Sequence, residues 1–188
     1  MDRRYYLKRG EHPQVLFILL NPSNATDEIN DATVRRLIAS TRQQGCDAFS
    51  VVNLFTLRTP HPKDLKGMHN PVGDGNTDLV RRLAHTHAVV VYAWGNLSAY
   101  LKKAYRWTNR EPDFLRTVVH PLCFRHTQSG AAGHPCRLHN NQLRWEPFRC
   151  ELRWRSGPPA FEAWLQARKL PLVFYLVDDD IDRIDQRC

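Results

Sequence analysis

The chain is poor in the features that mark disulfide-rich, metal-clustered or redox proteins. It has five cysteines among 188 residues, and no two of them form a C-x-x-C pair. An odd number of cysteines without such pairs argues against a disulfide framework, a zinc ribbon and a ligated iron–sulfur cluster. We therefore expect reduced thiols, no metal and no cofactor, and these expectations fit a cytoplasmic protein.

Long apolar runs are also lacking. No run is long enough to span a bilayer, and the first ten residues, MDRRYYLKRG, lack the apolar segment of a signal peptide. No internal repeat is visible. We expect a cytoplasmic monomer that does not engage a membrane.

Positive charge, by contrast, is abundant. The chain has 27 Lys and Arg against 19 Asp and Glu, which gives a formal net charge of +8. Such an excess favours a polyanionic partner, and arginine suits phosphate groups in particular. Five Trp, six Tyr and nine His offer rings on which bases can stack, although aromatic residues also fill protein cores. The composition therefore favours nucleic acid, and we expect DNA as the partner, either duplex or single-stranded.

Short apolar runs alternate with helical patterns along the chain. This alternation predicts an α/β fold with three α/β/α layers and a central, mainly parallel sheet of four strands. The four expected strands are residues 15–20, 49–55, 88–93 and 117–124. The expected helices are residues 32–44, 77–85 and 97–105.

The ends of these elements carry recognisable signals. Asp31 or Asn30 is expected to cap the first helix, which stops at Gly45, and Asn76 or Thr77 is expected to cap the second. An edge strand is expected around residues 5–7, and another edge or antiparallel strand within 143–155. Further along, residues 161–168 predict an extra helix, residues 172–177 an extra strand, and the acidic tail a solvated segment.

Polar residues gather where the predicted strands end. The first strand runs into the turn formers Asn21-Pro22-Ser23-Asn24, and the second carries Asn53 near its end. The third ends at Trp94-Gly95-Asn96, and a later loop contains His134-Pro135. Parallel strands place their carboxyl ends at one sheet edge, where α/β proteins bind ligands. We expect these four motifs to converge there.

The ordered set of motifs resembles the uracil-DNA glycosylase superfamily. The water-positioning motif of that superfamily matches LLNPSNA at 19–25, its base-reading Asn matches Asn53, its third strand end matches VYAWGN at 91–96, and its late His-Pro loop matches GHPCRL at 133–138. The same string of motifs, LNPS, VVNLF, AWGN and HP, also resembles a bacterial family known only as a domain of unknown function. The resemblance covers about residues 15–140 and implies one glycosylase-like domain over 1–188 with a C-terminal extension, 141–188.

The resemblance implies a monofunctional DNA glycosylase that flips a base and leaves an abasic site. Asn21 replaces the Asp of the efficient uracil enzymes, so it can orient water but cannot accept a proton. Ser23 replaces a bulky Tyr, which implies room for a 5-substituted or hypermodified pyrimidine. Glucosylated hydroxymethylcytosine of phage DNA is one such base, and its removal would serve antiviral defence. Cys136 replaces a Ser of the DNA-pinching loop, so that motif is only partly matched.

Each candidate residue has a functional and a structural interpretation. Asn21 would hold water or cap its own loop, His134 would donate to the base carbonyl or bond to backbone, and Asn53 would read the base edge or tie strand to loop. Asp27 and Asp31 would supply the missing general base or sit at a helix start. The further base-binding candidates are Ser23, Pro22, Phe55 and Asn96. The phosphate-binding candidates are Arg58, Lys63, Lys66, Arg125, Arg137 and His139.

Two other functions remain open at this point. The chain would be a non-catalytic nucleic-acid-binding protein if Asn21 had removed the chemistry of the same fold. It would be an N-glycosidase for free nucleosides or nucleotides if its substrate were small, although the charge of +8 favours a polymer.

Overall fold

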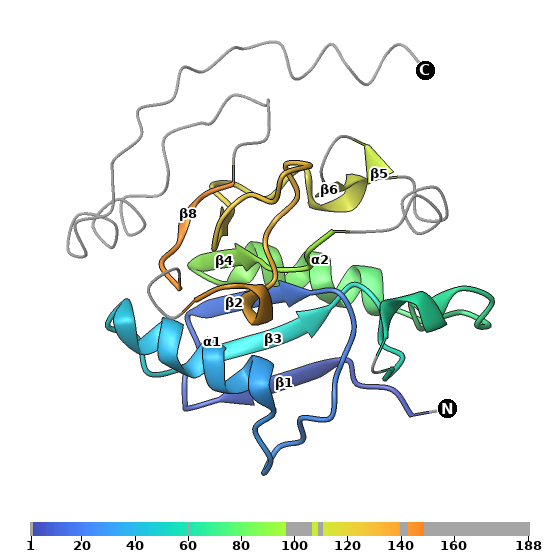
Figure 1. Ribbon diagram of the computed structural model, residues 1–188, viewed down its shortest axis with the longest axis horizontal. Helices are drawn as coiled ribbons and strands as arrows, with labels where there is room; N and C mark the ends of the chain where they lie inside the picture. Colours follow the sequence, from blue (N-terminus) through green and yellow to red (C-terminus); the bar gives the residue numbers. More distant parts are fainter. Residues whose placement is uncertain (1, 60, 97–106, 109–110, 140–142, 149–188) are drawn as a thin grey trace.

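The fold is a mixed α/β fold built on one six-stranded, mostly parallel sheet (Figure 1). The computed structural model describes residues 2–59, 61–96, 107–108, 111–139 and 143–148. In these ranges the sheet has the order β1-β3-β2-β4-β7-β8, and two α-helices accompany it. The strands are β1 (Tyr6–Arg9), β2 (Val15–Leu19), β3 (Phe49–Asn53), β4 (Val89–Tyr92), β7 (Leu122–Cys123) and β8 (Glu146–Pro147).

Four parallel strands form the centre of the sheet, and one antiparallel strand closes each edge. β3, β2, β4 and β7 run parallel, while β1 pairs antiparallel with β3, and β8 pairs antiparallel with β7. Both edge strands fall where the sequence predicts them. The expected four parallel strands are present, and the two edges widen the sheet to six.

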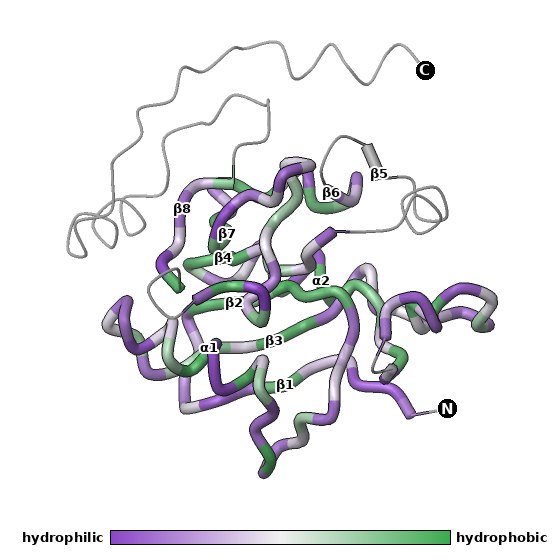
Figure 2. Tube along the Cα trace, in the orientation of Figure 1, coloured by the Kyte–Doolittle hydropathy of each residue, from purple (hydrophilic) through white to green (hydrophobic). Residues whose placement is uncertain are grey.

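In the part of the chain that the structure describes, one helix covers each face of the sheet. Alternate side chains of a strand point to opposite faces, so a strand buried on both faces is apolar throughout. α1 (Ala32–Gln43) packs Val34 and Leu37 into one core, which we call the α1-side core. α2 (Asn76–Thr86) packs Val80 and Ala84 into the other, the α2-side core. Figure 2 shows hydrophobic residues concentrated along β2 and β4, between these two layers.

The start of α1 agrees with the sequence, whereas the start of α2 does not. The Asp31 carboxylate accepts the backbone N–H of Val34 at 2.7 Å, and Gly45, at φ +69°, follows the helix end. In α2 the capping position belongs to Gly75, and Asn76 is instead buried. Its Nδ2 donates to the carbonyls of Asn53 and Leu54, so this side chain ties α2 to the end of β3.

The expected strand at 117–124 is too long. Only Leu122–Cys123 pairs with β4, because His120 adopts a positive φ of 53° and Pro121 has no N–H to donate. Short elements complete the described chain: the hairpin strands β5 (Trp107–Thr108) and β6 (Glu111–Pro112) and the 3-10 helices η1 (Pro62–Leu65), η2 (Asp113–Leu115) and η3 (Pro135–Arg137).

The predictions for 97–105, 161–168, 172–177 and the acidic tail fall outside the described residues. Within the described ranges, neither α1 nor α2 has the length and apolar character that crossing a bilayer requires.

Candidate functional site

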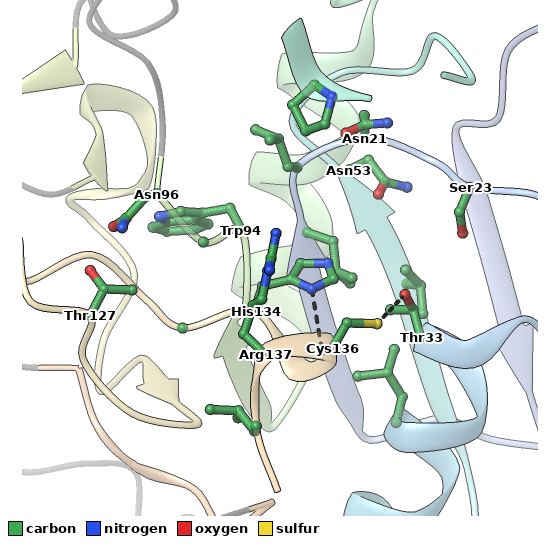
Figure 3. Close-up of a pocket in the computed structure, with 18 of the residues that line it drawn as sticks. Asn21, Ser23, Thr33, Asn53, Trp94, Asn96, Thr127, His134, Cys136 and Arg137 are labelled. Atoms are coloured by element: carbon green, nitrogen blue, oxygen red, sulfur yellow. Dashed lines mark hydrogen bonds between the residues drawn. The ribbon is translucent and has the colours of Figure 1, made fainter. Parts of the chain in front are cut away.

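A pocket of about 760 Å3 opens at the carboxyl ends of β2, β3 and β4 (Figure 3). Its walls come from all four motifs that the sequence places at strand ends. The predicted residues that line it are Asn21, Ser23, Asn53, Asn96, Arg125, His134 and Arg137. Asn21 and Asn53 lie on one side of the cavity, and His134 and Trp94 lie across from them. The predicted convergence is therefore confirmed.

Asn53 is the most unusual side chain of this pocket. It is the last residue of β3, it is 1% exposed, and neither its Nδ2 nor its Oδ1 has a hydrogen-bond partner. Leaving such groups unpaired costs about 1–3 kcal/mol each, so buried amides are normally satisfied. The structural interpretation, in which Asn53 ties strand to loop, is wrong for its side chain. Its amide presents one donor and one acceptor to whatever fills the pocket.

Asn21 is held in one orientation. Its Nδ2 donates to the carbonyl of Thr59 at 2.7 Å and to that of Pro22 at 3.2 Å. With the amide nitrogen committed to these carbonyls, Oδ1 is the atom left to accept a hydrogen bond in the pocket. An acceptor fixed in this way can orient a water molecule but cannot deprotonate it.

His134 is a neutral hydrogen-bond donor at physiological pH. It caps η3, and its Nδ1 accepts the backbone N–H of Cys136 at 3.3 Å. Burial, followed by the nearby Arg137, lowers the pKa of His134 to about 4, and Asp31 opposes this shift only in part. Because Nδ1 accepts, the single proton of the neutral ring belongs on Nε2. The structural interpretation holds, because the ring bonds to backbone. Donation from Nε2 to a base carbonyl stays a prediction.

Neither candidate acid reaches the pocket. Asp31 caps α1 and also accepts the Ser23 hydroxyl, and Asp27 lies exposed on the loop before α1. No Asp or Glu is among the residues that line the pocket in the described chain. The predicted general-base role of Asp27 and Asp31 is therefore not supported by their positions. The structural interpretation of Asp31 as a helix-start acid is confirmed.

Two predicted base contacts are misplaced. Phe55 is buried in the α2-side core and Pro22 is also buried, and neither lines the pocket. Trp94, which follows β4, lines the pocket. Its ring lies 4.4 Å from that of Tyr92 and is 1% exposed, so it serves as both core and wall. Asn96 lines the rim and accepts the Ser129 hydroxyl at 2.8 Å.

The predicted phosphate contacts divide into two groups. Arg125 and Arg137 are exposed and line the pocket, while Lys63, Lys66 and His139 are exposed without lining it. Arg58 belongs to neither group. Its Nε pairs with Asp2 at 2.9 Å, and its Nη1 donates to the carbonyls of Ser23 and Ala25. Arg58 therefore anchors the 21–25 turn, and its prediction as a phosphate ligand is not supported.

Arg4, Thr33 and Cys136 line the pocket and were not predicted as site residues. Arg4 is 9% exposed, and its Nη1 donates to the Ala25 carbonyl at 2.8 Å. Burial and the proximity of Arg58 lower its pKa to about 10. Its place in a basic, edge-strand segment gives no sign of this burial. Cys136 meets Thr33 at 3.1 Å, which joins η3 to the start of α1 (Figure 3).

Comparison with known proteins gives one result. A family model described as "Protein of unknown function (DUF1643)" matches residues 4–136, which include every segment that lines the pocket apart from its last residues, Arg137 and Leu138. No curated protein and no solved structure matches the chain. The match agrees with the resemblance to a domain of unknown function and carries no information about uracil-DNA glycosylases. The chain belongs to the DUF1643 family.

Proposed function

We propose that this protein is a DNA glycosylase and that the pocket binds a base flipped out of DNA. The observation that carries the proposal is the buried, unpaired amide of Asn53 in a pocket that also holds a fixed acceptor and a neutral donor. A pyrimidine edge has adjacent donors and acceptors, so it complements such an amide. The arginines at the rim favour a polyanionic substrate.

Each group has a part in hydrolysis. Asn21 Oδ1 orients a water molecule, whose oxygen bonds to C1′ of the sugar as the bond between C1′ and the base nitrogen breaks. The base leaves with the bonding electron pair, and His134 Nε2–H donates to its developing anionic oxygen. The proton that the water loses is finally taken up by the departing base. Because no carboxylate lines the pocket in the described chain, stabilisation of the leaving base supplies most of the rate.

The pocket suits a base with a large substituent. Its volume of about 760 Å3 is in the range of sites that hold whole drug-sized ligands, typically about 300–1,000 Å3. Ser23 is a small side chain, and its hydroxyl is turned to Asp31. The substrate we propose is a 5-substituted or hypermodified pyrimidine such as glucosylated hydroxymethylcytosine of phage DNA, and its excision in the cytoplasm would act as antiviral defence.

We also propose that the fold is the three-layer fold of the uracil-DNA glycosylase superfamily. The four parallel central strands, with α1 on one face and α2 on the other, support this assignment. The order of the strand-end motifs around one pocket supports it as well.

Release of free base from defined DNAs tests the proposed activity. Duplex and single-stranded DNA containing uracil, 5-hydroxymethylcytosine or its glucosylated form is incubated with the protein. Free base is measured by mass spectrometry, and abasic sites by alkaline cleavage. We expect release from at least one substituted pyrimidine, and a loss of about 100-fold or more in Asn21→Ala and His134→Ala.

Exposed residues of the same types provide matched controls. Asn24→Ala and His69→Ala, outside the pocket, should leave the rate unchanged. Salt-sensitive binding without base release would point to the non-catalytic binding protein. Cleavage of free nucleosides with no activity on DNA would point to the nucleoside N-glycosidase. Either result contradicts the proposal.

A further inference from the structure

Three side chains with different metal-binding chemistry meet at the paired strands β7 and β8 and the loop that follows β7. They are Cys123 of β7, His126 of the following loop and Glu146 of β8. One ligand atom from each, a thiol sulfur, an imidazole nitrogen and a carboxylate oxygen, lies within 4.8 Å of the other two. None of the three residues lines the pocket, so the cluster is separate from the proposed base site.

The fold brings these residues together by strand pairing. Cys123 and Glu146 are direct partners in the antiparallel register of β7 and β8, so their side chains share one face of the sheet. His126 follows Cys123 by three residues, and its side chain lies beside those of Cys123 and Glu146. Its ring stacks on buried Phe148, with centroids 5.5 Å apart and planes at 12°, which limits its rotation.

The distances suit one ion between the three groups. His126 Nδ1 lies 2.9 Å from Glu146 Oε1 and 4.0 Å from Cys123 Sγ, so the same nitrogen faces both other ligands. Zinc bond lengths and tetrahedral angles require separations of about 3.4 Å between nitrogen and oxygen and about 3.6 Å between nitrogen and sulfur. Shifts of about half an ångström bring the two nitrogen distances to these values, and the sulfur and oxygen atoms, which lie within 4.8 Å of each other, must approach to about 3.6 Å.

We propose that Cys123, His126 and Glu146 bind a divalent transition-metal ion, with zinc as the expected species. Mixed sulfur, nitrogen and oxygen ligands suit zinc and exclude the hard cations magnesium and calcium. Three protein ligands leave a fourth position for water. In the sequence the three ligands form a C-x-x-H motif followed by a distant Glu, so a search for C-x-x-C pairs does not find the site.

The ion would fix one wall of the pocket. His126 lies between Arg125 and Thr127, both of which line the pocket, and the same loop continues to His134. Clamping His126 to β7 and β8 therefore holds this loop at the rim. This role is structural and does not depend on the proposed glycosylase chemistry.

Cobalt(II) is the probe for the test. The full-length protein is stripped with a chelator, dialysed and titrated with cobalt(II) chloride, and zinc in the untreated protein is measured by elemental analysis. We expect one equivalent of cobalt with a thiolate-to-cobalt charge-transfer band. The band should disappear in Cys123→Ala and persist in Cys46→Ala and Cys136→Ala, which remove the other two described cysteines.

A second variant covers the case in which Cys123→Ala fails to fold. Glu146 is 49% exposed, so Glu146→Gln should preserve the fold and lower the cobalt affinity at least tenfold. The absence of the band from the native protein would overturn the proposal. So would a band that survives in folded Cys123→Ala, or unchanged cobalt affinity in Glu146→Gln.

Discussion

Asn53 and Asn76 are neighbouring buried asparagines, and both are 1% exposed. The amide nitrogen of Asn76 is used by the fold, because it donates to the carbonyls of Asn53 and Leu54. The side chain of Asn53 makes no hydrogen bond at all. A fold under selection for stability alone has no reason to keep such a group, and this is why we propose that a ligand pairs with Asn53.

The contrast gives opposite predictions for two similar substitutions. Asn53→Leu should raise the free energy of unfolding by about 1 kcal/mol, because it removes an unsatisfied buried amide. Asn76→Leu should lower it by about 1–3 kcal/mol, because two carbonyls lose their donor. Urea denaturation of both variants measures the difference. If Asn53→Leu were as destabilising as Asn76→Leu, Asn53 would have a structural role instead.

The low pKa of His134 predicts how stability depends on pH. Burial and Arg137 lower the pKa from 6.5 to about 4 in the folded state. Between these values the unfolded chain binds a proton that the folded chain does not, so the stabilisation present above pH 6.5 declines as the pH falls toward 4. From pH 7 to pH 4 the native protein should lose on the order of 2 kcal/mol more than His134→Gln.

Urea unfolding of both proteins at several pH values checks this difference. His87, whose pKa burial also lowers, titrates in both proteins and cancels in the comparison. Parallel stability curves for native protein and His134→Gln would show that His134 is not kept neutral by the fold.

At the scale of elements, hydrogen bonds fix the segment from Asn21 to Asp31 at its carboxyl end and along its length. At one end, Asp31 caps α1 and accepts the Ser23 hydroxyl. Along its length, three arginines donate to its carbonyls: Arg4 and Arg58 to that of Ala25, and Arg9 of β1 to that of Thr26. These contacts place Asn21 and Ser23 at the pocket, so part of the basic charge of the chain has a structural use.

The capping contact predicts different effects for the two candidate acids. Asp31→Ala should lower the free energy of unfolding by about 1–2 kcal/mol because the N-cap is lost, whereas Asp27→Ala should change it by less than about 0.5 kcal/mol. Asp31→Asn keeps a capping oxygen and should recover most of the loss. Urea denaturation measures all three. Equal losses in Asp31→Ala and Asp27→Ala would remove the capping explanation.

At the scale of the molecule, the basic residues behind the net charge of +8 divide into anchors bonded to the fold and exposed cations. Arg4 and Arg58 are tied to the 21–25 turn, while Arg125 and Arg137 remain exposed at the pocket. Only exposed cations release counterions from DNA on binding.

Arg125→Ala and Arg137→Ala should therefore each weaken DNA binding and reduce the slope of log affinity against log salt concentration by about 1. Fluorescence anisotropy with labelled DNA at several salt concentrations measures this slope. Arg82→Ala, an exposed position on α2 outside the pocket, is the control and should leave the slope unchanged. Equal effects in all three variants would indicate diffuse attraction with no binding face.

Local patterns in the sequence predicted the four parallel strands, both described helices and the positions of the edge strands, but not the short strands β5 and β6. They did so because burial on one or both faces imposes a periodicity on neighbouring residues. The prediction from sequence failed where a distant contact or an unusual backbone angle changed the local structure. Asn76 does not cap α2 but bonds to the end of β3, and the positive φ of His120 makes β7 shorter than predicted.

The sequence by itself determined the α/β fold, a cap at Asn30 or Asp31 and the four strand-end motifs. Only the tertiary structure decided which polar groups are satisfied, since a hydrogen-bond partner lies anywhere along the chain. In the structure the Asn53 side chain has no hydrogen-bond partner and Arg58 pairs with Asp2. The aromatic residue that lines the pocket is Trp94, where the sequence predicted Phe55. The tertiary structure also joined Cys123 and His126 to Glu146, through a strand pairing that no local spacing encodes.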